Sequence, residues 1–191
     1  MSVNHVPPLV DAAVALADRV GFLNSCRPEH GRLLQVLAGG VGNGVIGETG
    51  TGCGVGLAWL ASGAGPGARL VSVERDPVRA AAAAEVFAGD PRVRVVTGDW
   101  RDLRRDAPFD LLILDGGGQG KGDEPPLDPA DWLRPGGAVV LDDFTPMTAW
   151  PPTHDGQIDA ARTYWLRHPR LCAAELRVAP DAASIVATYI G

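Results

Sequence analysis

The chain has only three cysteines, Cys26, Cys53 and Cys172, and their number is odd. Their spacing does not match a metal-binding pattern, so we expect reduced thiols. No apolar run approaches the ~20 residues that a membrane-spanning helix needs. The N-terminus also lacks the charged region and apolar stretch of a secretory signal. These absences predict a cytoplasmic protein with no membrane partner.

Positive charge is also scarce. There are 17 Lys and Arg residues against 23 Asp and Glu, for a net charge of −6. No basic stripe is visible, which argues against nucleic acid as a partner. The one small arginine cluster has acids between its members, and we interpret it as a solvated face: Arg101, Arg104 and Arg105 with Asp99, Asp102 and Asp106. An apolar fraction of 46% in 191 residues predicts one globular domain.

Apolar periodicity predicts alternating helices and strands. Helices are expected over residues 9–20, from Ser25 or Cys26 to 39, and over 55–62, 77–88, 128–134 and 157–168. Strands are expected over 44–47, 69–74, 93–97, 110–115, 138–141, 172–179 and 184–190, the last two forming a hairpin around residues 180–183. The nearly continuous apolar strands are typical of a parallel sheet covered on both faces.

This order predicts an α/β fold, a three-layer doubly wound Rossmann-like sandwich. We expect residues 1–191 to form a single domain, with N-terminal helices over 1–43 and the α/β core over 44–191.

The most informative tract is Val45–Gly56. An apolar run ends in Glu48, and glycines follow at positions 50, 52 and 54. This order predicts a strand, a tight turn that a ligand can approach closely, and a helix. The dinucleotide fingerprint G-x-G-x-x-G does not fit, because its third glycine would fall at Val55 when counted from Gly50. The phosphate loop does not fit either, because no lysine follows.

The remaining pattern, E-x-G-x-G-x-G, resembles motif I of class I S-adenosylmethionine-dependent methyltransferases. In that family the glycines admit the methionine part of the cofactor. The resemblance implies a mostly parallel seven-stranded sheet with an antiparallel last strand. It also implies cofactor contacts from the motif itself, at Glu48, Gly50, Thr51, Gly52 and Gly54.

Acidic residues end the expected core strands or follow them closely. Ligands bind beyond these strand ends in open parallel sheets. Glu74 could accept hydrogen bonds from both ribose hydroxyls, although nicotinamide cofactors use the same geometry. The resemblance places Glu74 at the adenosine ribose, Asp99 at the adenine amino group, and Trp100 against the ring. Arg75, next to Glu74, is also expected to bind the cofactor. The alternatives are a helix-capping acid for Glu74, a turn residue for Asp99 and a core side chain for Trp100.

A narrower resemblance follows from Asp115, after the strand over 110–115, and Asp142-Asp143, after the strand over 138–141. The pattern is similar to that of the catechol and caffeoyl-CoA O-methyltransferase group. It implies that Asp115, Asp142 and Asp143 hold a divalent metal such as Mg²⁺, which would lower the pKa of a substrate hydroxyl. Asp115 and Asp142 would face the reaction, and Asp115 would also border the cofactor. The alternative is metal-free hydrogen bonding or general base catalysis by Asp142 and Asp143.

The chain departs from that group in one respect. The group has a lysine a few residues after the first acid, whereas this chain has Gly117-Gly118-Gln119 and then Lys121. We expect Lys121 to be mobile and solvated. His154 could act as a base near neutral pH, but a loop histidine is more often solvated.

Further residues are expected around the substrate. Arg27 and Glu29 lie at the expected start of the second helix, in a region that often closes over the cofactor in the family. The loops over 116–128 and 143–156 would set the acceptor, and the second is rich in aromatic and apolar residues. Tyr164 and Trp165 are expected to pack a helix.

The sequence thus predicts a methyltransferase that uses S-adenosylmethionine, with O-methylation of a small molecule as the leading interpretation. One alternative is a non-catalytic cofactor-binding protein of the same fold. The other is an NAD-dependent oxidoreductase, which the glycine spacing and the lack of a Tyr-x-x-x-Lys pair disfavour. The acceptor, the need for a metal, the identity of a base and homodimer formation are left open by the sequence.

Overall fold

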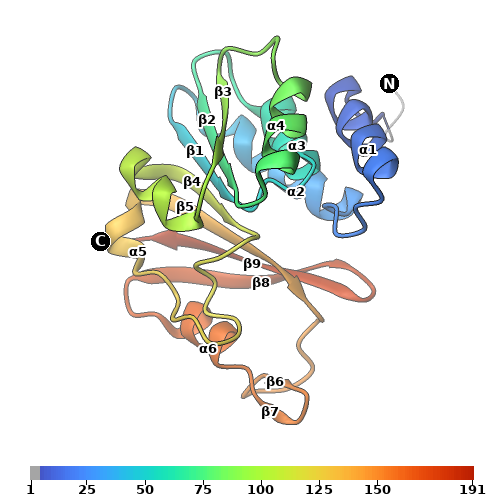
Figure 1. Ribbon diagram of the computed structural model, residues 1–191. Coiled ribbons are helices and arrows are strands. Elements are labelled where there is room, and N and C mark those ends of the chain that lie inside the picture. Colours follow the sequence, from blue (N-terminus) through green and yellow to red (C-terminus); the bar gives the residue numbers. More distant parts are fainter. Residues whose placement is uncertain (1–4) are drawn as a thin grey trace.

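The computed structural model describes residues 5–191, which build a seven-stranded sheet between two layers of helices (Figure 1). The strands are β1 (Val45–Thr49), β2 (Arg69–Glu74), β3 (Val93–Thr97), β4 (Phe109–Leu114), β5 (Leu133–Phe144), β8 (Leu171–Ala179) and β9 (Ala182–Tyr189). Their order across the sheet is β3-β2-β1-β4-β5-β9-β8. Strands β1 to β5 are parallel, and β9 is antiparallel to both of its neighbours. The predicted α/β sandwich with an antiparallel last strand is therefore confirmed.

Helices cover both faces of this sheet. They are α1 (Pro8–Val20), α2 (Pro28–Gly39), α3 (Val55–Gly63), α4 (Pro77–Val86), α5 (Pro129–Trp132) and α6 (Ala160–Arg167), with a 3-10 helix η1 (Trp100–Asp106). Figure 1 shows α1 to α4 grouped on one side of the sheet and α5 and α6 on the other. A separate two-stranded hairpin, β6 (Thr153–His154) and β7 (Gln157–Ile158), projects from the second side.

Alternation along the central strands divides the core into two layers, because successive side chains of a strand point to opposite faces. Leu112 and Leu114 pack with residues of η1, α5 and α6, whereas Leu111 and Ile113 pack with residues of α1, α2 and α3. All four of these side chains are almost fully buried. A strand buried on both faces explains why the sequence of β4 reads as a continuous apolar run.

Helix starts follow local chemistry. Asp76 caps α4 by accepting from the backbone N–H groups of Val78 and Arg79, as its position before Pro77 predicts. Pro28 lies in the first turn of α2, as predicted, and Cys26 directly precedes the N-cap residue, one position from the predicted start. Arg27 is the N-cap residue there, without a side-chain cap, and the helix begins at Pro28.

The other differences from the predicted elements lie at turns. The helix expected over 128–134 is only the single turn α5, because the chain turns into β5 at Leu133. Helix α6 begins at Ala160, after the cap Asp159, rather than at 157. The segment over 100–106 forms η1, and only residues 180 and 181 separate β8 from β9. Over the described residues, no helix has the length and apolar character needed to cross a membrane.

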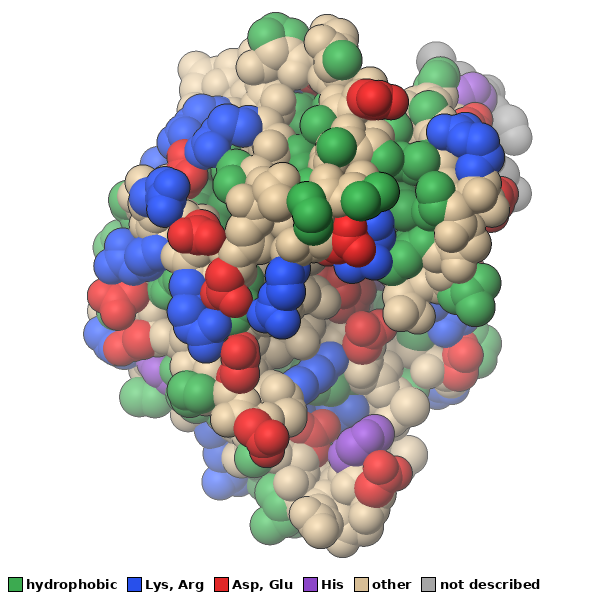
Figure 2. Space-filling view, viewed as in Figure 1, with side chains coloured by type: hydrophobic (Ala, Val, Ile, Leu, Met, Phe, Trp, Pro, Cys, Tyr) green, Lys and Arg blue, Asp and Glu red, His purple; other side chains and the backbone are tan. Residues whose placement is uncertain are grey.

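The solvated arginine cluster is confirmed. Arg101, Arg104 and Arg105 are exposed and each makes an ion pair with an acid. On the face seen in Figure 2, basic and acidic side chains are interspersed.

Candidate active site

A cavity of about 850 Å³ opens where the parallel strands end. Its walls come from the glycine turn after β1, the ends of β2, β4 and β5, the segment before α2, and the turn between β8 and β9. Seven of the ten residues predicted to bind the cofactor line it: Gly50, Thr51, Gly52, Glu74, Arg75, Trp100 and Asp115. The other three, Glu48, Gly54 and Asp99, do not line this cavity.

The glycine turn has a backbone that other residues rarely adopt. Gly50, Gly52 and Gly54 have φ values of 87°, 54° and 84°, in the left-handed region that favours glycine. At Gly50 there is also no room for a side chain, because a Cβ would lie 2.7 Å from the backbone of Gly116 after β4. The turn therefore brings its bare backbone against the cavity, as the sequence predicts.

Glu48 lies beneath this turn and is 2% exposed. Ser72 on β2 donates a hydrogen bond to its carboxylate, and the Ser72 hydroxyl also contacts that of Thr51 at 2.6 Å. Burial raises the pKa of Glu48 to about 8, and the Ser72 hydrogen bond offsets part of this rise. Glu48 thus supports the turn from behind rather than lining the cavity.

Glu74, at the end of β2, connects the strand to the glycine turn. One carboxylate oxygen accepts from the Gly52 N–H at 2.8 Å, and the other accepts from Asp76 N–H and the Arg79 guanidinium at 2.9 and 3.0 Å. It is buried but borders the cavity. A carboxylate in this place is positioned to receive the hydroxyl groups of a bound ribose.

Asp99 and Trp100 match their structural alternatives more closely. Asp99 caps η1 and pairs with Arg101 and Arg75. The hydrogen bond from the Arg101 backbone N–H, helped by the two guanidinium groups, lowers the pKa of Asp99. Trp100 is 8% exposed and belongs to the core layer, while part of it still borders the cavity. Its indole N–H donates to Glu124 at 3.0 Å.

Asp115, Asp142 and Asp143 come together at the ends of β4 and β5. One carboxylate oxygen from each lies within 4.8 Å of the others. The pKa of Asp142 is raised to about 7 by burial and by the charge of Asp143. Burial and the charge of Asp142 raise the pKa of Asp115 well above its ordinary value. The cluster therefore holds closely spaced carboxylates that repel one another.

An irregularity in β5 produces this arrangement. The pairing of β5 with β9 shifts register between Leu141 and Phe144, and Asp143 has φ of 60°, unusual for a residue other than glycine. Such a bulge redirects side chains near the end of a strand. Here it places Asp142 and Asp143 on the cavity together, although they are adjacent in sequence.

The prediction of a solvated Lys121 is wrong. Its ammonium group donates to the backbone carbonyl of Asp142 at 2.7 Å and lies 4.2 Å from the centroid of the Phe144 ring. Burial lowers its pKa. Gly118, Gly120 and Gly122 all have positive φ, which lets the loop after β4 fold back and bring Lys121 to the end of β5.

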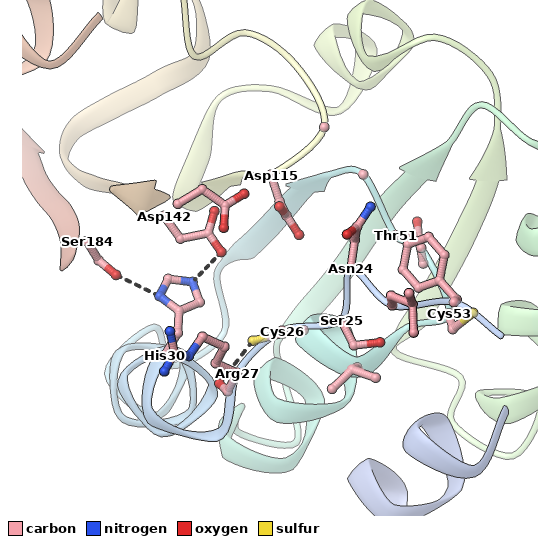
Figure 3. A pocket seen from close by; sticks show the side chains of 18 of the residues that line it. Asn24, Ser25, Cys26, Arg27, His30, Thr51, Cys53, Asp115, Asp142 and Ser184 are labelled. Carbon is pink, nitrogen blue, oxygen red and sulfur yellow. Dashed lines mark hydrogen bonds and ion pairs between the residues drawn. The ribbon is translucent and has the colours of Figure 1, made fainter. Parts of the chain in front are cut away.

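Two buried polar residues beside the acids were not predicted from the sequence. His30 on α2 is 4% exposed and lies between Ser184 and Asp142 (Figure 3). Its Nδ1 is 2.8 Å from Ser184 Oγ, and its Nε2 is 3.5 Å from Asp142 Oδ2. Burial lowers the pKa of His30 to about 4. The sequence offers only a weak signal, a polar residue among the apolar positions of an amphipathic helix.

Of the remaining predicted site residues, Arg27 lines the cavity and the others do not. Arg27 makes two hydrogen bonds to Asp181 in the β8–β9 turn, each 3.1 Å long. Glu29 and His154 do not line the cavity, and the His154 side chain is 72% exposed in the β6–β7 hairpin. Tyr164 and Trp165 pack α6 as expected, with the Trp165 ring fully buried.

The residues present suit the two ligands that the fold implies, a divalent cation and a nucleoside cofactor. The donors at the acids are all carboxylate oxygens, which hard divalent cations prefer. Asp142 Oδ1 is buried without a hydrogen-bond partner among the described residues. An unpartnered buried oxygen costs free energy unless a cation or a water molecule binds it. The glycine turn, Glu74 and the acidic rim together suit a nucleoside ligand that carries a positive charge.

Comparisons with known proteins agree with this geometry. A family profile described as a methyltransferase domain matches residues 48–144, about half of the chain. A protein of Mycolicibacterium vanbaalenii named as an O-methyltransferase is 31% identical over 153 residues, covering 73% of this chain and 66% of that one. One of Mycobacteroides abscessus is 31% identical over 128 residues, covering 60% and 56%. The chain spans about half the length of several curated relatives that it matches.

Solved structures share the whole fold. The cofactor-bound protein Rv0187 from MTB is 25% identical, with a TM-score of 0.77 over 100% of this chain and 94% of that one. The O-methyltransferase TomG from Streptomyces achromogenes, solved in complex with SAM, is 20% identical, with a TM-score of 0.76 over 99% and 92%.

Proposed function

Because the chain belongs to a family of methyltransferase domains, we propose that it transfers a methyl group from S-adenosylmethionine to a hydroxyl oxygen of a small molecule. We further propose that a divalent cation, such as Mg²⁺, takes part. The observation that carries the proposal is the meeting of the glycine turn and three carboxylates in one cavity.

The cofactor side of the site is formed by β1 and β2. The backbone of Gly50 to Gly52 receives the methionine part, and Glu74 accepts from the ribose hydroxyls. Trp100 and Gly98 border the same cavity beyond Glu74 and would line the adenine end. Asp115 lies between this region and the acids of β5, so it would border the transferred methyl group. The acidic lining favours a cationic sulfonium over an uncharged ligand.

The acceptor side is formed by β5, α2 and the β8–β9 turn. Asp115, Asp142 and Asp143 would hold the cation. When bound, the cation would lower the pKa of an acceptor hydroxyl and provide positive charge beside it. Phe144, Thr145 and Val178 line the adjacent wall and would contact the body of the acceptor. The protein's contribution is to fix the two reactants in line and exclude water from them.

Two other functions would use parts of the same site. A non-catalytic cofactor-binding protein would need the glycine turn and Glu74 but not the three clustered acids. An NAD-dependent oxidoreductase would use Glu74, but it conflicts with the family match. A homodimer and a cytoplasmic location remain predictions from sequence, as does the division of the single domain at residue 44.

The test follows transfer of a labelled methyl group from S-adenosylmethionine to a panel of catechols and simple phenols. We expect methylation of catechols that EDTA abolishes. D142A should lower the rate by about 100-fold or more, because a cation's charge stabilisation is worth several kcal/mol. The matched control D18A removes an exposed carboxylate of α1 and should leave the rate unchanged.

Isothermal titration with NAD and with S-adenosylmethionine, run beside the transfer assay, gives each alternative its own outcome. Binding of NAD without binding of S-adenosylmethionine would favour the oxidoreductase. Binding of S-adenosylmethionine without transfer to any member of the panel would favour the non-catalytic protein. Transfer that is unaffected by both EDTA and D142A would refute the role of the cation but keep the methyltransferase.

A further inference from the structure

We propose that His30 is a positioning residue for the cation site, and that with Ser184 it holds the carboxylate of Asp142 in its ligating orientation. The inference rests on the proposed function, because it concerns Asp142 as a cation ligand. It assigns a role in the active site to α2, a helix that lies outside the segment matched by the family profile.

His30 is placed at the junction of three elements. It projects from the first turn of α2 toward the neighbouring strands β5 and β9, which carry Asp142 and Ser184. Its side chain is 5% exposed and that of Asp142 is 14% exposed. Figure 3 shows the imidazole ring between the two residues, with one nitrogen directed at each.

The partners determine which ring nitrogen donates. A carboxylate can only accept, whereas a serine hydroxyl can donate or accept. When Asp142 is ionised, as it must be to bind a cation, the nitrogen facing it must therefore carry the hydrogen. When the ring has a single N–H, the Ser184 hydroxyl donates to Nδ1, and this leaves Nε2–H directed at Asp142 Oδ2. Ser184 thus fixes the ring in the form that Asp142 needs.

The two oxygens of Asp142 have different surroundings. Oδ2 lies 3.5 Å from His30 Nε2, which is longer than a direct hydrogen bond. Oδ1 is buried and has no partner among the residues that the structure describes. Interaction of Oδ2 with His30 leaves Oδ1 as the oxygen available to a cation shared with Asp115 and Asp143. A small closing movement on cation binding would bring His30 to hydrogen-bond distance.

Asp142 is also held through its backbone. Lys121 donates to its carbonyl oxygen at 2.7 Å, so the residue is fixed from the β4 side by Lys121 and from the α2 side by His30. Outer partners of this kind orient ligands, and their loss typically lowers metal affinity by about 10- to 100-fold. A histidine that only filled the core would have no such effect on cation affinity.

The test measures Mn²⁺ binding by the electron paramagnetic resonance signal of free Mn²⁺, and S-adenosylhomocysteine binding by calorimetry. We expect H30L to raise the Kd for Mn²⁺ by about 10-fold with little change in the Kd for S-adenosylhomocysteine. H30Q, which can keep an N–H near the position of Nε2, should retain most of the affinity. S184A should weaken Mn²⁺ binding less than H30L does. Q35L, on the same helix, is the control.

The outcomes separate this inference from the proposed function. Equal Mn²⁺ affinity in wild type and H30L would overturn the role of His30 and leave the cation site intact. Parallel loss of Mn²⁺ and S-adenosylhomocysteine binding in both H30L and S184A would also overturn it, because it would indicate a general packing role. Absence of Mn²⁺ binding by the wild type would overturn the cation site itself and this inference with it.

Discussion

Glu48 has a carboxyl group inside the sheet, where burial raises its pKa to about 8 from an ordinary value of 4.5. Between these two pH values, the folded protein retains a proton that the unfolded chain has released. The free energy of unfolding must then fall as the pH rises across this range, by at most ~1.4 kcal/mol per pH unit for one such group. The raised pKa values of Asp115 and Asp142 add to this decrease in the free energy of unfolding.

We therefore predict that the protein without cofactor or metal is more stable at pH 6 than at pH 8, and that E48Q reduces this difference. Urea denaturation at the two pH values measures both effects. Glutamine keeps the shape of the side chain and cannot ionise, so it is the matched substitution. Stability that rises with pH in the wild type, or an unchanged difference in E48Q, would contradict the description of Glu48.

Some residues of the site could be predicted from the sequence, and others could not. The positions of Glu74, Asp115, Asp142 and Asp143 followed from their place at strand ends, because parallel strands bring these ends to one edge. His30 could not be predicted in the same way. Its partner Ser184 is 154 positions away, and no local pattern gives the register between a helix and a distant strand.

At the scale of elements, the glycine turn is the part whose conformation the sequence determines most strongly. It has the left-handed backbone at three alternate positions, and at Gly50 it also lies against Gly116. Together these leave little freedom for substitution, so a single methyl group should be enough to disturb cofactor binding.

We predict that G50A weakens binding of S-adenosylhomocysteine by at least ~10-fold and destabilises the protein by about 1–3 kcal/mol, the cost of a strained backbone, or more because of the contact with Gly116. Calorimetry and thermal denaturation measure the two effects. G89A is the control, because a Cβ at Gly89 would meet no described atom within 4 Å and the residue has no positive φ. Wild-type binding by G50A would contradict the placement of the cofactor.

Turns and loops account for the elements that the sequence did not predict. The bulge in β5 and the fold of the loop that brings in Lys121 depend on long-range packing rather than on local propensity. Phe144 shows the reason, since its ring lies between Lys121 at 4.2 Å and Arg162 at 4.8 Å, and these residues come from a loop and from α6. No short window of sequence contains all three.

At the scale of the whole molecule, the alternation of apolar runs was enough to predict the sheet and its two helical layers. The site depends on contacts between two segments that are far apart in the sequence, residues 27–30 and 181–184. Arg27 pairs with Asp181 and His30 with Ser184, so α2 and the β8–β9 turn together close one wall of the cavity. The acceptor wall is therefore built by segments that sequence patterns treat separately.

The most direct test is a crystal structure of the protein with S-adenosylhomocysteine and Mn²⁺, in which anomalous scattering identifies the metal. We expect the nucleoside on the glycine turn, with its ribose at Glu74, and an anomalous peak shared by Asp115, Asp142 and Asp143. A bound nucleoside with no anomalous peak at these three carboxylates, or no nucleoside at the glycine turn, would contradict it.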